Sequence, residues 1–164
     1  MKHLEDLERM MTYFTQPPGA FLTVKDKEGR VNTMTVSWGF IGEMWNEPHF
    51  ICVVRPQRYT FKLIENAVDF TISVPYGSLA DELHICGTKS GANMDKSEVV
   101  KFIPAQKTIS PVVDGCNAYL ECLINYSDSL KEAFMSDEAK SFYNNDEHHF
   151  YIGKIVGAYL RDVG

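Results

Sequence analysis

Two arginines and a threonine lie close together in the segment Arg55-Pro56-Gln57-Arg58-Tyr59-Thr60. An apolar run, residues 49–55, leads into this segment, and a helical pattern, residues 59–65, begins inside it. The order places two guanidinium groups, a hydroxyl group and the unpaired amides of a helix N-terminus at one corner of the fold. Guanidinium groups offer paired, charged donors to phosphate oxygens, so the segment predicts a site for a phosphate monoester. The alternative is a capped surface helix whose arginines face water.

A second polar segment, Cys86-Gly87-Thr88-Lys89-Ser90-Gly91, follows a helical pattern that begins at Ser78. Its two glycines allow a ligand to approach the backbone closely, and its hydroxyl groups can bind a polar ligand. Lys89, or Lys96 further along the chain, could add positive charge. The alternative is a helix that ends at Gly87 and continues as a flexible loop.

The strand-like stretch Val31 to Gly42, VNTMTVSWGFIG, is expected to hold these segments around one ligand. Side chains alternate between the two faces of a strand. One face is largely apolar and suits a core; it comprises Asn32, Met34, Val36, Trp38 and Phe40. The other face is small and polar, as expected where a flat polar ligand lies against the backbone; it comprises Thr33, Thr35, Ser37 and Gly39. The alternative is an antiparallel strand whose Thr and Ser side chains face water.

The rest of the chain alternates strands and short turns with few helices. Helical spacing covers residues 3–14, and a helix or ordered insertion is expected at residues 131–143. Further strands are expected at residues 20–25, 49–55, 69–74, 116–126 and 148–160. A parallel sheet would need a helix between successive strands, and that regular alternation is missing. The sequence therefore predicts a mainly β fold, an antiparallel barrel with a few peripheral helices.

Length and composition narrow the class of protein. The 164 residues are 45% hydrophobic and 23% charged, which is typical of one globular domain, residues 1–164. A net charge of -6 argues against nucleic acid as a partner, because binding phosphates needs a basic surface. No apolar run is long enough to span a bilayer and the start is polar, so we expect no membrane partner and a cytoplasmic protein. The four cysteines lack metal-knuckle or redox spacing and are expected to be reduced and mostly buried.

Taken in order, these segments resemble the flavin reductase and flavoredoxin family. The first half of the likeness covers Asn32-x-Met34-Thr35-x-Ser37-Trp38, Arg55-Pro-x-Arg58-Tyr59-Thr60 and Phe70 to Pro75. The second half covers Cys86-Gly87-Thr88-x-Ser90-Gly91, the pair Asp95-Lys96, Leu120 to Cys122, and the closing run His148-x-x-Tyr151-Ile152-Gly153-x-Ile155. Each piece is weakly specific, but the ordered set spans nearly the whole chain.

The resemblance implies a split β-barrel that binds FMN as a homodimer, with the flavin across the dimer interface. It also implies NAD(P)H as electron donor, its nicotinamide stacked over the flavin, and therefore an FMN-dependent oxidoreductase. A non-enzymatic flavin-binding protein or electron carrier that uses the same site is the alternative. The residues implied to bind the cofactor are Met34, Thr35, Val36, Ser37, Trp38, Arg55, Gln57, Arg58, Tyr59, Thr60, Cys86, Gly87, Thr88, Ser90, Gly91 and Lys96.

The polar parts of FMN have candidate partners in these segments. Residues 55–60 suit the phosphate, Ser37 and Thr88 suit the ribityl chain, and the backbone amides of residues 35–39 suit the pyrimidine edge of the ring. Arg55 closes a strand and is expected to hold the phosphate more firmly than Arg58, which has room to point to solvent.

His148 is the candidate for a direct part in catalysis, because the resemblance places it near the flavin or the hydride donor. A metal site shared with His149 is not expected, since adjacent residues of a strand point to opposite faces. His49 and His84 have no companion at ligand spacing, and no serine lies in a nucleophile-elbow sequence. The sequence therefore predicts no metal site and no Ser-His-Asp triad.

Overall fold

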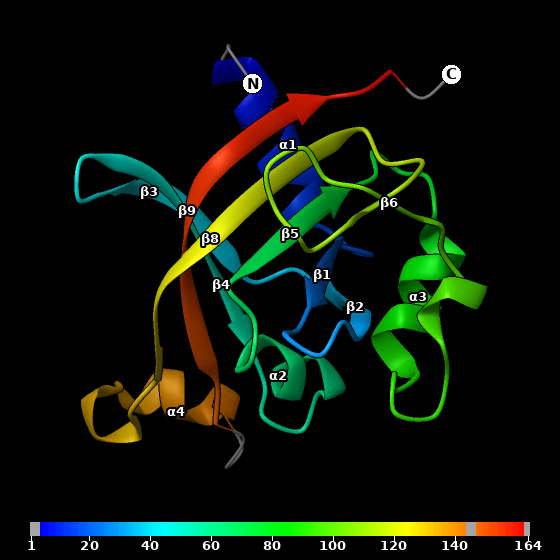
Figure 1. Ribbon diagram of the computed structural model, residues 1–164. Coiled ribbons are helices and arrows are strands. Elements are labelled where there is room, and N and C mark those ends of the chain that lie inside the picture. The colour runs from blue at the N-terminus through cyan, green and yellow to red at the C-terminus, as the bar shows by residue number, and fades with distance from the viewer. Residues whose placement is uncertain (1–3, 144–146, 163–164) are drawn as a thin grey trace.

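A sheet of seven antiparallel strands forms the centre of the computed structural model, which describes residues 4–143 and 147–162 (Figure 1). The strand order is β2-β1-β5-β8-β9-β4-β3. The strands are β1 (Ala20–Lys25), β2 (Val31–Val36), β3 (Gly39–Met44), β4 (Glu47–Val54), β5 (Asp69–Val74), β8 (Ala118–Ser129) and β9 (His149–Leu160). The helices are α1 (Leu4–Thr15), α2 (Tyr59–Ile64), α3 (Ala80–Thr88) and α4 (Asp137–Tyr143). The mainly β, antiparallel prediction is confirmed.

The sheet curls so that its two edge strands meet at one corner. β2 and β3 are the outermost strands of the sheet, yet only Ser37 and Trp38 separate them in the chain. Three steps between consecutive Cα atoms span at most about 11 Å, so the end of β2 lies close to the start of β3. In the described part of the chain no ladder joins these two strands, so the curled sheet is not closed. An open corner lined by Ser37 and Trp38 results.

The prediction of one strand from Val31 to Gly42 is wrong, because the stretch forms two strands. β2 pairs with β1, and the register Ala20↔Val36 is the last pair, since β1 begins at Ala20 after a turn at Gly19. The chain then crosses to β4, where Gly39 pairs with Cys52. A Cβ at Gly39 would lie 2.6 Å from the carbonyl oxygen of Ile51, so the backbone packs closely as β3 begins.

The predicted division of this stretch into a core face and a ligand face is only partly right. Met34 and Val36 are buried in the core, but Trp38 and Phe40 are 50% and 63% exposed because they lie beyond the break. Thr33 was expected on the ligand face, yet it is fully buried and donates to the carbonyl oxygen of Leu22 at 3.1 Å. Helix α3 packs on part of this face, where the Oγ1 of Thr35 donates to the carbonyl oxygen of Leu83.

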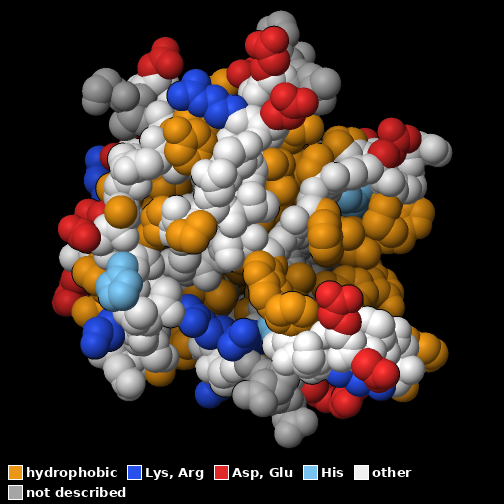
Figure 2. Space-filling view, turned by 180° about the vertical axis from the view of Figure 1, so that it is seen from behind, with side chains coloured by type: hydrophobic (Ala, Val, Ile, Leu, Met, Phe, Trp, Pro, Cys, Tyr) orange, Lys and Arg blue, Asp and Glu red, His pale blue; other side chains and the backbone are white. Residues whose placement is uncertain are grey.

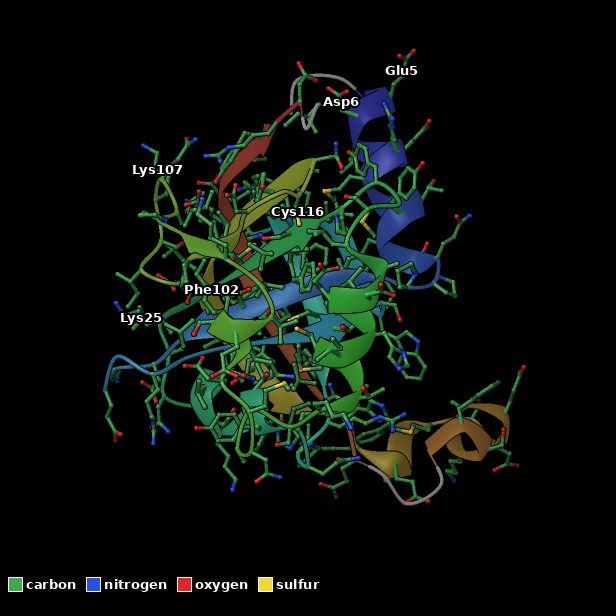
Figure 3. The ribbon with its side chains drawn as sticks, turned by 90° about the vertical axis from the view of Figure 1, so that its right-hand side faces the viewer. Glu5, Asp6, Lys25, Phe102, Lys107 and Cys116 are labelled. Atoms are coloured by element: carbon green, nitrogen blue, oxygen red, sulfur yellow. The ribbon has the colours of Figure 1, made fainter. Side chains whose placement is uncertain are left out.

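Two apolar cores lie on opposite sides of the sheet. The larger core packs α1 and α2 against strands β1, β4, β5 and β8. The smaller core lies under α3 and a two-stranded ribbon, β6 (Phe102–Ile103) with β7 (Val112–Val113), which sequence patterns did not predict. All four cysteines are buried and unpaired, as expected; Cys116 belongs to the smaller core, and Figure 3 labels it to the left of α1. The two cores fix the sheet and α3, which frame the open corner.

Two carboxylates on the sheet hold the loop of residues 104–111. Glu121 of β8 is fully buried and accepts hydrogen bonds from the amides of Gln106 at 2.8 Å, Lys107 at 2.5 Å and Thr108 at 3.0 Å. Asp69 of β5 accepts from the next two amides, at 2.8 and 3.0 Å. Buried backbone amides need acceptors. The two carboxylates supply the acceptors that a neighbouring strand would otherwise supply to this loop.

Several element boundaries differ from those predicted. Helix α3 begins at Ala80, with Leu79 as its N-cap, and continues through Cys86 and Gly87 to Thr88. The segment at residues 131–143 divides into a 3-10 turn, Glu132–Phe134, and helix α4. In the described ranges no helix is both long and apolar enough to cross a bilayer.

Candidate functional site

Two adjoining hollows lie at the open corner of the sheet. The larger has a volume of about 360 Å³ and is lined by residues 34–38, Val53, Arg55, Gln57, Arg58 and His148. The smaller has a volume of about 110 Å³ and is lined by residues 32–34, 57–60 and 86–91. Met34, Gln57 and Arg58 border both. The structure therefore brings together His148 and all of the predicted cofactor residues except Lys96, from segments far apart in the sequence.

Arg58 joins the smaller hollow to the end of helix α3. Its Nη1 donates to the carbonyl oxygen of Gly87 at 2.9 Å, and its Nη2 donates to that of Cys86 at 3.4 Å. The last carbonyls of a helix have no partner inside it, and a guanidinium stabilises them. The expectation that Arg58 points to solvent is wrong. Burial, and then the positive charge of Arg55, lower the pKa of Arg58, so an anion in the hollow would stabilise its charged form.

Lys96 supports the same helix end and is not brought to either hollow. It is buried, and its Nζ donates to the carbonyl oxygen of Lys89 at 2.5 Å and to that of Ile85 at 3.4 Å. Burial lowers the pKa of this ammonium group. Lys96 is the first residue of the 3-10 turn Lys96–Glu98. Its contacts stabilise the end of α3 and the loop that follows, so its role is structural.

Two glycines of this wall allow close approach of neighbouring strands and helices. A Cβ at Gly87 would lie 3.3 Å from the side chain of Thr35, and one at Gly91 would overlap Asn32 and lie 2.7 Å from the ring of Tyr59. Only glycine fits at residue 91 without a shift of the wall. The two glycines therefore let residues 86–91 pack directly against Thr35, Asn32 and Tyr59 at the wall of the smaller hollow.

Asn32 is one of three polar residues of this site that the cofactor prediction omitted, with Thr33 and Lys89. Its Nδ2 donates to the Oγ1 of Thr60 at 2.8 Å, which links β2 to helix α2 beneath the hollow. As acceptor of this bond, Thr60 keeps its hydroxyl hydrogen to donate. The sequence did contain a signal for Asn32. Its polar side chain lies among apolar residues on the predicted core face of the strand, where it needs a hydrogen-bond partner.

The larger hollow has Arg55 and His148 on one wall. The Nε of Arg55 donates to the Nε2 of His148 at 3.1 Å. The indole of Trp38 stacks on the imidazole, with ring centroids 5.3 Å apart and an angle of 18° between the planes. His148 is 2% exposed and accepts this bond beneath Trp38.

A third, apolar hollow of about 520 Å³ continues from the larger one along the outside of the sheet. Its lining includes Trp38, Phe40, Ile51, Phe150 and, from the start of the arm (residues 130–143), Leu130. Figure 2 shows hydrophobic side chains gathered between the β3–β4 hairpin and the arm, with basic side chains beside them. The open corner thus combines a basic, polar end with an apolar surface.

Metal sites in proteins are built from several ligating side chains that lie close together. Within residues 4–143 and 147–162, no three His, Cys, Asp or Glu side chains come together as a metal site requires. His49 lies between protein partners instead, with Nδ1 2.8 Å from the carbonyl oxygen of Glu47 and Nε2 3.2 Å from the Nδ2 of Asn125. The corner offers charged and polar donors that suit an anionic ligand, next to an apolar surface.

Comparison with known proteins gives a consistent result. A family model described as a flavin reductase like domain matches residues 11–163. The chain is 25% identical to flavoredoxin from Methanosarcina acetivorans, with a TM-score of 0.68 over 87% of this chain and 68% of that one. An FMN-binding protein from Thermus thermophilus is 22% identical, with a TM-score of 0.70 over 87% and 71% of the two chains. A putative flavin reductase with a split barrel domain, from Shewanella frigidimarina, is 20% identical, with a TM-score of 0.70 over 97% and 76%.

Proposed function

The chain belongs to the flavin reductase like family, and we propose that it binds FMN and passes electrons from NAD(P)H to this flavin, or through it to an acceptor. The observation that carries the proposal is the pair of joined hollows at the open corner, one large and one small, with Arg58 between them. FMN has the same division, since a flat ring system is linked through a ribityl chain to a phosphate.

The sizes of the hollows support one orientation of FMN. Ligand pockets usually have volumes of about 300–1,000 Å³, a range that the larger hollow reaches and the smaller does not. The ring therefore lies in the larger hollow, against the backbone of residues 34–38, whose amides face its pyrimidine edge. The phosphate lies in the smaller one.

The donors around the smaller hollow suit a phosphate and the chain that leads to it. Arg58 supplies the charge, and Thr60 and the first amides of α2 supply further donors. The Oγ1 of Thr88 donates to the carbonyl oxygen of His84 at 2.8 Å, so it accepts from a ribityl hydroxyl. The Oγ of Ser90 accepts from the amide of Ala92 at 3.2 Å and keeps its hydrogen for the phosphate.

The cofactor supplies the redox chemistry, and the protein supplies position. When bound, the flavin would supply a hydride acceptor, its N5 atom, for a nicotinamide donor. This transfer needs alignment more than a protein acid or base, which suits a site built from amides, hydroxyls and arginines. Trp38 and Phe40 keep water from the outer side of the site. The four unpaired, buried cysteines support a reducing compartment such as the cytoplasm.

A second copy of this chain completes the site in our proposal. Trp38 and Phe40 border the apolar hollow and are largely exposed in one chain. Contiguous apolar surface of this kind is uncommon on monomers and typical of an interface. Because the same hollow opens into the ring site, a partner that covers it would also enclose the flavin.

Replacing Phe40 with lysine should weaken the dimer by tenfold or more, because a charged side chain would be buried at the centre of the interface. Sedimentation at micromolar concentration measures the change. Ile109, which is 55% exposed on the loop of residues 104–111, gives a matched control as Ile109→Lys. A wild-type protein that sediments as a clean 18.7 kDa species would contradict the dimer.

Stopped-flow absorption tests the activity. Mixing the FMN-loaded protein with NADH or NADPH without oxygen should bleach the flavin band faster than mixing free FMN with the same donor. Bleaching at the rate of free FMN with both donors would contradict the oxidoreductase. Tight FMN binding together with that result would instead support an electron carrier that receives electrons from another protein.

A further inference from the structure

We infer that His148 positions Arg55 and that Arg55, held in this way, raises the reduction potential of the bound flavin. The inference rests on the proposed FMN site and assigns separate roles to the two arginines of the segment 55–60. Arg58 binds the phosphate, and Arg55 places a positive charge near the flavin ring.

The sheet register brings the two residues together. β4 and β9 are paired with Val54 opposite His149, so the residues that flank this last pair, Arg55 and His148, meet where the two strands separate. Their side chains make the bond from Nε to Nε2 at 3.1 Å. A residue placed by two paired strands is held more rigidly than one on a loop.

The chemistry of the two groups sets the direction of this bond. Arginine can only donate, so the Nε2 of His148 must present a lone pair. The imidazole is therefore neutral and carries its proton on Nδ1. Trp38 stacks on the face of the imidazole, and the imidazole itself is buried, so the accepting side of the bond is held in one orientation. The unit of Trp38, His148 and Arg55 thus fixes a positive charge at the wall of the larger hollow.

The charge of Arg55 acts on the ring because of where the residue lies. Arg55 borders the larger hollow, whereas Arg58 borders both and is anchored on α3. When a nicotinamide gives one hydride to the oxidised ring, two electrons and one proton move together. The donor becomes a nicotinamide cation and the ring gains a negative charge. A fixed positive charge nearby therefore stabilises the reduced ring more than the oxidised ring.

The midpoint potential of bound FMN measures this difference directly. In Arg55→Gln, the preference for reduced over oxidised flavin should fall about three- to tenfold, a decrease of about 15–30 mV for a two-electron couple. The Arg55→Gln change should lower the affinity for oxidised FMN and the affinity for riboflavin by the same factor, because in this proposal Arg55 does not contact the phosphate. Lys107→Gln removes the same charge from an exposed side chain on the far side of the molecule from the arm (Figure 3) and should leave the potential unchanged.

Variants of His148 test the positioning role. His148→Leu should lower the midpoint potential, but by less than Arg55→Gln does. His148→Gln, whose amide oxygen can accept the bond from Arg55, should have the potential of the wild type. In the double variant with Arg55→Gln, the leucine should cause no further fall, because the two residues act as a unit. If the leucine variant does not fold, the same comparison is made between His148→Gln and His148→Met.

The outcomes separate this inference from the proposed function. A wild-type protein that binds no FMN would overturn both. A protein that binds FMN with the same potential in wild type and Arg55→Gln would overturn the tuning role alone. Additive effects of the His148 and Arg55 changes would overturn the positioning role.

Discussion

Replacing Arg58 with glutamine should lower the affinity for FMN about ten- to a hundredfold and leave the affinity for riboflavin nearly unchanged. A hydrogen bond to a charged group contributes about 1.5–3 kcal/mol, and the half-buried guanidinium would lose such bonds to the phosphate. Riboflavin lacks the phosphate and does not depend on them. Fluorescence titrations of both ligands against wild type and variant measure the two affinities.

Glutamine is chosen because Arg58 has two roles. Its Nη1 also donates to the carbonyl oxygen of Gly87 at 2.9 Å, and a glutamine amide can still reach toward that end of α3. Arg58→Ala removes both roles and should cost stability as well. Equal losses of FMN and riboflavin binding in the glutamine variant would show that Arg58 supports the helix and does not bind the phosphate.

Replacing Glu121 with glutamine should lower the free energy of unfolding by about 3 kcal/mol. The carboxylate accepts three backbone amides inside the protein, and an amide group would turn its NH₂ toward at least one of these donors. The cost is the loss of a bond to a charged group, about 1.5–3 kcal/mol, with weakening of the others. Because domains are stable by only about 5–15 kcal/mol, the change should be large in urea unfolding.

Two comparisons show whether this loss comes from the loop. Glu8→Gln, on the exposed side of α1, makes the same chemical change and should stay within about 0.5 kcal/mol of wild type. Hydrogen exchange of the amides of residues 106–108 should speed up in the Glu121 variant. An unfolding midpoint equal to that of wild type would contradict a structural role for the buried carboxylate.

Patterns local to the sequence predicted most strands and the residues that gather at the site. Alternation identified β5, and a nearly continuous apolar run identified β4, because the apolar residues of both strands face a core. Ordered short motifs brought residues 34–38, 55–60 and 86–91 together without any geometry. Contacts between segments that are distant in the sequence could not be predicted from these local patterns. The break at Ser37 and Trp38 depends on where β1 begins, and the burial of Lys96 depends on the end of α3.

The roles of Arg55 and Arg58 also depend on contacts that local sequence patterns do not predict. From the sequence, Arg55 and Arg58 are equivalent donors on one segment, and Arg55 is the better-directed phosphate ligand. In the structure, each finds a partner distant in sequence, His148 for Arg55 and the α3 carbonyls for Arg58. A spacing of three residues indicates that the two guanidinium groups are near one another, but it does not identify the partner of either one.

Titration of the purified apoprotein with FMN tests the proposed cofactor site most directly. Increments of FMN should saturate one site per chain, with a shifted flavin absorption band and quenched flavin fluorescence as the ring enters the larger hollow beside Trp38. Gly91→Val, whose Cβ would overlap Asn32 and displace the wall of the smaller hollow, should abolish saturation in the same concentration range. A spectrum of protein and FMN equal to the sum of the two separate spectra, at every ratio, would contradict the flavin site.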